Sequence, residues 1–181
     1  MRFIFLYGPD GSGKTTVAIE LAKNLEKSMI LPFEPGKFGV KVDEIDSGFQ
    51  GKNSALNKSI PILFSYILFL RYILRFILFR LRYSKKFKYV IVTRGPLEFG
   101  INNTHQNFPN YFSLLLQRKI SKNYFVVSRP VSIILMQKPE LPRLRILQLY
   151  EDYLKMGATP VINIELSTCV NTLYKLIKKI E

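Results

Sequence analysis

The sequence predicts an α/β fold in three layers, a five-stranded parallel sheet with helices on both faces. An apolar run, Arg2–Tyr7, leads directly into a glycine-rich loop and then into apolar residues at helical spacing. Further short runs are almost continuously apolar, as strands buried in a parallel sheet are. Segments with helical periodicity separate these runs, and a chain of 181 residues suits one domain.

The loop after the first run predicts a site for the phosphates of ATP. Its sequence is Gly8, four residues, then Gly13, Lys14 and Thr15. The glycines let successive N–H groups point at an anion, at the positive end of a helix that begins near Lys14. Lys14 then reaches the β- and γ-phosphates, and the Thr15 hydroxyl binds Mg²⁺. The residues expected to bind the nucleotide are Gly8, Asp10, Gly11, Ser12, Gly13, Lys14, Thr15 and Thr16.

Four further strands and two later helices complete the expected fold. The strands are expected at residues 29–33 (MILPF), 89–93 (YVIVT), 132–136 (SIILM) and 160–164 (PVINI). A helix is expected from Pro142 to Met156, ending at Gly157. A closing helix has one apolar face, made by Val170, Leu173, Tyr174, Ile177 and Ile180. Ligands of such sheets bind at the carboxyl ends of the strands.

Residues 59–83 form the most apolar part of the chain and are expected to be one long helix, buried in its first half. The uncharged portion ends at Leu70, too short to cross a bilayer core of about 30 Å. Cationic residues then recur at Arg71, Arg75, Arg80 and Arg82. At about 100° per residue, all but Arg80 fall within one narrow sector. Three interpretations stay open: a core helix with solvated arginines, a wall that binds substrate phosphate, and a helix on a membrane surface.

The charge and the cysteine content restrict the class of partner and the compartment. Lys and Arg number 27 against 13 Asp and Glu, a formal net charge of +14, so anionic partners are expected. Nucleotides, nucleic acid and an acidic membrane surface all qualify, and a homodimer stays open as well. The single cysteine, Cys169, has no partner for an internal disulfide and is expected to be a small core residue. With no secretory signal before the loop, the sequence favours a cytoplasmic protein.

Several short motifs together resemble one family. Gly8-Pro9-Asp10 opens the loop, Phe33-Glu34-Pro35-Gly36 follows the second strand, and Ile62-Leu63-Phe64 lies in the long helix. Thr93-Arg94 ends the third strand, and residues 134–145 (ILMQKPELPRLR) contain Pro-Glu followed by arginines. In order and spacing these motifs resemble those of the thymidylate kinase-type nucleoside monophosphate kinases, which belong to the P-loop NTPase superfamily.

The resemblance implies a single P-loop kinase domain over residues 1–181, with a short lid at about 138–148. It implies transfer of the γ-phosphoryl of ATP, with Mg²⁺, to a nucleoside monophosphate, with dTMP as the first expectation. Such a reaction depends on positioning and on positive charge near the transferring oxygens. Arginines and the loop lysine are therefore the expected catalytic groups.

The resemblance also assigns roles to individual residues. Asp10 is expected to face the 3′-hydroxyl of the acceptor and Phe64 to stack on its base. Arg94 is expected to contact the acceptor phosphate and stabilise the transferring group. Arg143 and Arg145 stand where the family carries the arginines of its lid. The remaining residues expected near the acceptor are Glu34, Arg71 and Gln106, with Asn103 as the alternative to Gln106 for reading the base.

The chain departs from the family pattern at several positions. Thr93 replaces an aspartate beside the magnesium, and a neutral hydroxyl is a poorer ligand for that ion. Glu98, in the loop after the third strand, or Glu34 is expected to compensate by holding a magnesium-bound water. Phe33 replaces an arginine, and the lid is short, which excludes water less well. Two alternatives to a kinase stay open: a diverged nucleotide-binding paralogue, and a basic P-loop protein of nucleic acid or membrane surfaces.

Overall fold

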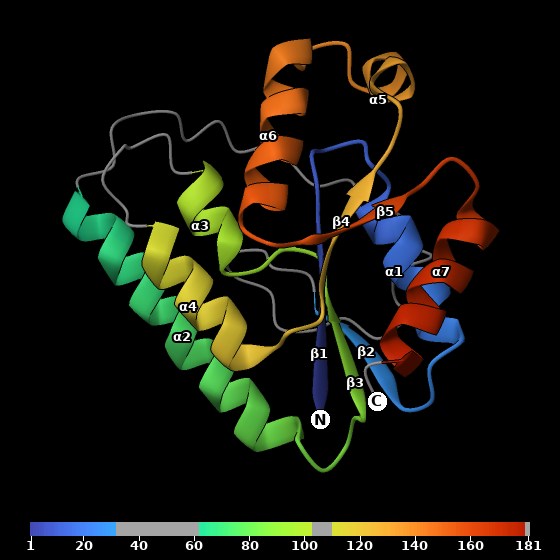
Figure 1. Ribbon diagram of the computed structural model, residues 1–181. Coiled ribbons are helices and arrows are strands. Elements are labelled where there is room, and N and C mark those ends of the chain that lie inside the picture. The colour runs from blue at the N-terminus through green and yellow to red at the C-terminus, as the bar shows by residue number, and fades with distance from the viewer. Residues whose placement is uncertain (32–61, 103–109, 180–181) are drawn as a thin grey trace.

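The computed structural model describes residues 1–31, 62–102 and 110–179. Within them the chain forms one five-stranded sheet in the order β2-β3-β1-β4-β5, with every neighbouring pair parallel (Figure 1). The predicted fold class is therefore confirmed. The strands are β1 (Arg2–Tyr7), β2 (Ser28–Leu31), β3 (Tyr89–Val92), β4 (Tyr124–Ser128) and β5 (Thr159–Ile162).

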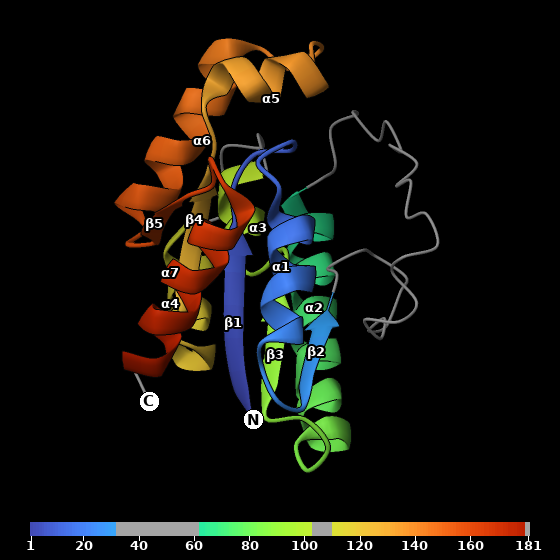
Figure 2. The same cartoon turned by 90° about the vertical axis from the view of Figure 1, so that its right-hand side faces the viewer.

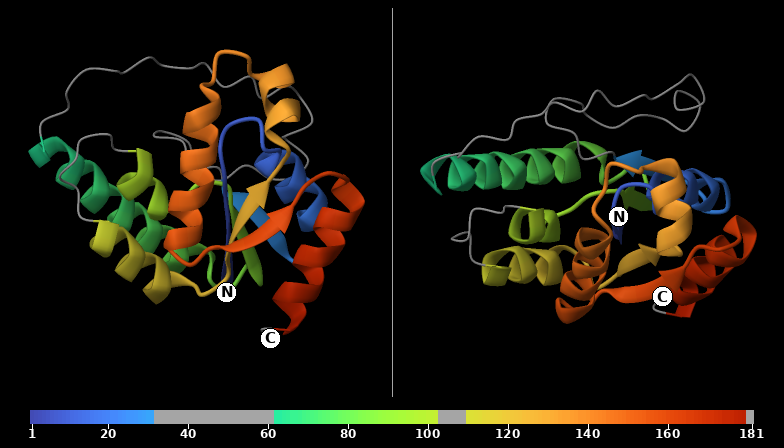
Figure 3. Two further views of the ribbon diagram at one scale, coloured as in Figure 1. Left: turned by 45° about the horizontal axis from the view of Figure 1, so that its top comes forward. Right: turned by 90° about the horizontal axis from the view of Figure 1, so that it is seen from above.

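Helices cover both faces of the sheet (Figure 2). The helices are α1 (Lys14–Lys23), α2 (Ile62–Tyr83), α3 (Leu97–Asn102), α4 (Asn110–Ile120), α5 (Val131–Gln137), α6 (Arg143–Lys155) and α7 (Leu166–Lys179). The helices α1 and α7 bury their apolar sides against one face, while α2, α3, α4 and α6 pack against the other. The short helix α5 lies beyond the edge at which the strands end (Figure 3).

The alternation of side chains along β1 explains why two separate cores form. Ile4 and Leu6 point to the core shared with α1 and α7, whereas Phe3, Phe5 and Tyr7 point to the core on the opposite face. Because side chains of a strand alternate between faces, a strand covered on both sides must be apolar throughout. The continuous apolar run at the amino end of the chain thus reflects its central place in the sheet.

The expected strand at 132–136 is wrong, because these residues lie in α5. The fourth strand is instead β4, which pairs with β1 and β5. Pro130 precedes the helix with φ −50° and ψ 131°, and within α5 only Ile134 is fully buried. One-sided burial of an apolar run is typical of a helix at a surface. The aromatic and β-branched residues of 124–127 (YFVV) carry the strand signal that the sequence interpretation passed over.

The other expected elements agree with the structure. The helix expected from Pro142 to Met156 is α6, and Gly157 follows it with φ +83°. The long helix expected in 59–83 is α2, and no helix of the described residues is long and apolar enough to cross a membrane. Cys169 is a core residue as predicted, and burial raises the pKa of its thiol to about 11.

Candidate functional site

The loop between β1 and α1 has the backbone geometry of an anion cradle. Gly8, Gly11 and Gly13 have φ values of +138°, +84° and +86°, which side chains rarely allow. Gly13 is the N-cap of α1, and no side chain caps this helix end or adds an acid to its first turn. The first N–H groups of the helix are therefore left for a ligand, and they favour a negative charge.

The loop is held in place by the ends of β4 and β5. The Asn163 side-chain amide donates to the carbonyl of Ser12 at 2.9 Å. A Cβ atom on Gly13 would come within 2.5 Å of the same amide nitrogen, and one on Gly8 within 2.7 Å of the Val127 carbonyl oxygen. Glycine is thus required at both positions by close packing as well as by φ. Asn163 follows β5, and sequence reasoning missed it because nothing local connects it with the loop.

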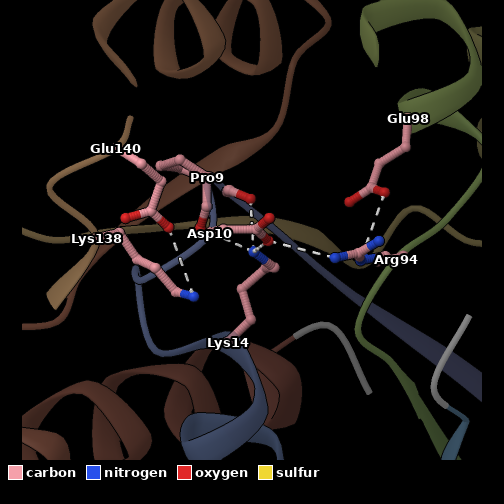
Figure 4. A network of polar contacts seen from close by, with 8 residues as sticks. Pro9, Asp10, Lys14, Arg94, Glu98, Lys138 and Glu140 are labelled. Atoms are coloured by element: carbon pink, nitrogen blue, oxygen red, sulfur yellow. Dashed lines mark hydrogen bonds and ion pairs between the residues drawn. The ribbon is translucent and has the colours of Figure 1, made fainter. Parts of the chain in front are cut away.

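Lys14 is buried beneath the loop and bonds to its backbone. Its Nζ donates to the carbonyls of Gly8 and Pro9 at 2.7 and 2.8 Å, and lies 3.8 Å from an oxygen of Asp10 (Figure 4). Burial lowers the pKa of Lys14, while the nearby carboxylates of Glu98 and Asp10 oppose that shift. The ammonium group is therefore positioned by the loop itself, next to two acids.

Arg94 joins the loop to the end of β3. Its Nη2 donates to Asp10 at 3.3 Å, and its Nε lies 3.9 Å from Glu98 (Figure 4). Glu98 is largely buried, and this burial raises its pKa to about 7, although the positive charges of Arg94 and Lys14 act in the opposite direction. The arrangement brings two carboxylates and two cations together at the carboxyl edge of the sheet.

A cavity of about 260 Å³ opens beside these groups. Gly8, Asp10, Arg94, Glu98 and Arg145 all line it, so five of the predicted site residues border one cavity. Arg145 comes from α6 and donates from Nη2 to the carbonyl of Ile101 at 3.4 Å. Arg143 begins the same helix but is exposed and does not belong to the cavity lining found among the described residues.

A further cation, Lys138, lies over the loop from the side of α5. A Cβ atom on Gly11 would meet Ile134 at 3.2 Å and the Lys138 stem at 3.5 Å, so both side chains lie against this glycine. The Lys138 ammonium pairs with Glu140 at 3.8 Å (Figure 4). Lys138 was not among the predicted site residues, although it stands at the start of the expected lid. Its place in the expected lid was the only signal that the sequence offered for it.

Aromatic side chains and one side-chain amide pack next to the site. The Tyr7 hydroxyl donates to Gln117 at 2.5 Å, and its ring stacks on Tyr153 with centroids 5.2 Å apart. A Cβ atom on Gly95 would collide with the Tyr7 hydroxyl and lie 2.5 Å from the Phe5 ring. The backbone after Arg94 therefore rests directly on β1. This close contact fixes the position from which Arg94 extends.

The residues at the loop fit a magnesium–nucleotide complex in the kind of donor they offer. Thr15 supplies a hydroxyl on the first turn of α1, and Asp10 and Glu98 supply carboxylates near Lys14. Mg²⁺ takes oxygen ligands, keeps several waters, and is held in such sites by one or two protein groups plus phosphates. The described residues contain no cluster of three or more metal-binding side chains.

Four of the residues predicted to contact the substrate have side chains outside the described part of the chain. Glu34 and Gln106 lie outside the described residues, as does the alternative Asn103. Phe64 and Arg71 belong to α2, but their side chains lie outside the described part of the chain. Thr93, which stands where the resembling family has an aspartate, is buried at the end of β3.

Comparison with known proteins gives matches in structure only. No protein-family model matches the chain, and no curated protein sequence matches it. A thymidylate kinase from Ehrlichia chaffeensis has a TM-score of 0.55 and 14% identity, with 98% of each chain covered. A thymidylate kinase from Candida albicans has a TM-score of 0.61 and 15% identity, covering 98% of this chain and 91% of that one. The chain therefore has a P-loop kinase-like α/β fold, similar to that of these enzymes.

Proposed function

We propose that the protein is a phosphotransferase that moves the γ-phosphoryl group of ATP to a nucleoside monophosphate, with dTMP as the first candidate. One observation carries this proposal: Asp10, Arg94 and Arg145 line a single cavity that adjoins the phosphate loop. A kinase needs its acceptor and its donor phosphate next to each other with positive charge between them. The similarity in fold to thymidylate kinases supports the same assignment.

In this proposal the loop amides and Lys14 hold the donor phosphates. Arg94 and Arg145 stabilise the negative charge that spreads over the equatorial oxygens during transfer, a contribution worth about 10³ to 10⁵ in rate for a well-placed arginine. Asp10 binds the sugar hydroxyl of the acceptor and, through its 3.3 Å contact, holds Arg94 in position. Thr15, with Glu98 nearby, would hold Mg²⁺ beside the phosphates, where the ion would supply further positive charge.

The decisive measurement is ADP formation from ATP over a panel of ribo- and deoxyribonucleoside monophosphates. We expect ADP release to require one acceptor and to fall by about 10³ or more in Lys14→Ala. Lys23→Ala is the matched control, because Lys23 lies on the same helix but is exposed and pairs only with Glu20 among the described acids, at 3.0 Å. ADP release that needs no acceptor, in the wild type, would contradict the proposed transfer.

Arg143 and Arg145 can be ranked by the same assay. Because Arg145 lines the cavity and Arg143 does not, Arg145→Ala should lower kcat by much more than Arg143→Ala. Equal losses would mean that both arginines enter the site when nucleotide binds. A larger loss in Arg143→Ala would contradict the ranking.

Thr93 favours a second candidate, a nucleotide-binding protein with weak or no kinase activity. The residue is buried and neutral at the end of β3. Glu98, the acid expected to compensate for the missing aspartate, has its pKa raised to about 7. A carboxyl group that is partly protonated near neutral pH is a weaker partner for a metal ion. If magnesium–ATP binds to the wild type and only Thr93→Asp forms ADP with an acceptor, this second candidate is correct.

A further inference from the structure

The helix α2 is apolar on two opposite sides, and only one of them faces the core. Phe76 and Phe79 are buried against the sheet. Five further large apolar residues are between 48% and 73% exposed, namely Leu70, Leu74, Ile77, Leu78 and Leu81. At about 100° per residue these five form one stripe, roughly opposite the two buried phenylalanines. We call this set the α2 stripe.

The α2 stripe continues into a groove beside α4. The groove has a volume of about 420 Å³ and is lined mainly by apolar side chains, among them Ile77, Leu81 and Leu116. A contiguous exposed apolar surface of this kind marks an interaction site rather than ordinary surface. Arg80 and Lys119, one from each helix, are the charged residues of its lining.

Exposed cations surround the stripe, and acids are missing from its sequence. Arg80 and Arg82 project to either side of it at helical spacing, and five more exposed cations follow in the neighbouring segments: Lys85, Lys86, Lys88, Arg118 and Lys119. Residues 62–88 contain no Asp or Glu. Leucines along one side of a helix with arginines and lysines at its borders match the interfacial region of an anionic bilayer, where acyl chains lie beneath negative headgroups.

We propose that the α2 stripe and its cationic border bind the surface of an anionic phospholipid membrane. A second copy of the chain fits this surface less well, because residues 62–88 of either copy contain no acid to pair with the cations that the other copy would bring to the contact. Nucleic acid fits less well too, because it would leave five exposed leucine and isoleucine side chains without an apolar partner.

Binding to a membrane through the α2 stripe would leave the phosphate loop accessible. Figure 1 places the carboxyl ends of α2 and α4 at the end of the molecule away from α5 and the loop that joins β1 to α1. The protein would lie on the bilayer by one side, and none of the described helices is long and apolar enough to cross it. This surface is separate from the proposed phosphotransfer site, so the failure of either proposal would leave the other unaffected.

The test is co-sedimentation of the full chain with vesicles of phosphatidylcholine, with and without phosphatidylserine. We expect binding to the mixed vesicles that weakens at high salt, and about tenfold weaker binding in Leu74→Glu/Leu81→Glu. The matched control is Leu144→Glu/Leu154→Glu, which makes the same charge change at two exposed leucines of α6. Equal binding by the two double variants, or no binding by the wild type, would overturn the proposal.

A second measurement does not depend on those variants folding normally. The chain contains no tryptophan, so Leu78→Trp introduces a single reporter at an exposed position of the stripe. Its emission should shift to shorter wavelength when phosphatidylserine vesicles are added, and an unchanged spectrum would count against insertion. Two other results would overturn the proposal in favour of another occupant. They are a dimer without vesicles that Leu74→Glu/Leu81→Glu dissociates, and oligonucleotide binding that this variant abolishes.

Discussion

Glu98 shows how one residue couples the site to pH. Its carboxyl is held among Arg94, Lys14 and Asp10, and burial outweighs the cations and raises its pKa from 4.5 to about 7. Between these values the folded chain keeps a proton that the unfolded chain has lost. The stabilisation that this proton gives to the folded state is therefore fully present below pH 4.5 and is lost as the pH rises through about 7.

We expect Glu98→Gln to remove that dependence. From the shift, the free energy of unfolding of the wild type should fall by up to about 3 kcal/mol relative to the variant between pH 5 and pH 8. Urea unfolding at several pH values measures it. Glu140→Gln is the control, since Glu140 is exposed and pairs with Lys138 at 3.8 Å. Parallel pH profiles for wild type and Glu98→Gln would show that the carboxyl is already ionised at pH 5.

The residues of the site differ in how readily the sequence predicts them. Lys14 and the loop glycines act within a few residues of each other, so spacing alone predicted them. The contact between Arg94 and Asp10 joins residues 84 positions apart. The family resemblance assigned both residues to the acceptor but did not predict their contact. Asn163 and Ser12 are 151 positions apart, and Asn163 belongs to no recognisable motif. Long-range contacts of single polar groups leave no periodic trace in a sequence.

Among the elements, the Tyr150 hydroxyl links α6 to the end of β4, where α5 begins. The backbone N–H of Arg129, just after β4, donates to the Tyr150 hydroxyl of α6 at 2.9 Å. The same hydroxyl lies 3.4 Å from the Arg129 carbonyl oxygen, to which it donates. Burial of this hydroxyl raises the pKa of Tyr150. The start of α5, whose Ile134 covers Gly11, is thereby connected to α6.

We expect Tyr150→Phe to lower the free energy of unfolding by about 1 to 3 kcal/mol, because a partly buried N–H group loses its partner. Tyr174→Phe is the control, since the Tyr174 ring is half-buried beside Lys178 and no hydrogen bond of its hydroxyl is found among the described residues. Chemical denaturation of both variants measures the difference. An equal, small effect of the two substitutions would mean that water replaces the Tyr150 hydroxyl.

The misassigned strand at 132–136 shows where local pattern misleads. Five apolar or small residues in a row satisfy a buried strand and a short surface helix equally well. The neighbouring elements distinguish the two structures, because Pro130 precedes a new element and β4 already occupies the position next to β1. For 89–93 the same kind of run was assigned correctly, because β3 is covered on both faces.

At the scale of the molecule, stability depends on the two cores on either side of the sheet. Leu173 of α7 is fully buried in the core shared with α1 and β1. Leu173→Ala should lower the free energy of unfolding by about 2 to 5 kcal/mol, through lost apolar burial and the cavity that remains. Leu144→Ala, on the exposed side of α6, is the control and should change little. A small loss at Leu173 would mean that α7 closes over the space.

The phosphate loop, the type of most elements and the parallel α/β class could all be predicted from the sequence. These follow from interactions between near neighbours and from the period of apolar residues, both of which are written along the chain. Three features follow from the packing of the folded chain instead: the strand order, the joining of Asp10, Arg94 and Arg145 at one cavity, and the exposure of the α2 stripe. Which apolar face of a helix meets the core depends on the neighbours that folding supplies, and a period of 3.6 residues cannot tell one apolar side from the other.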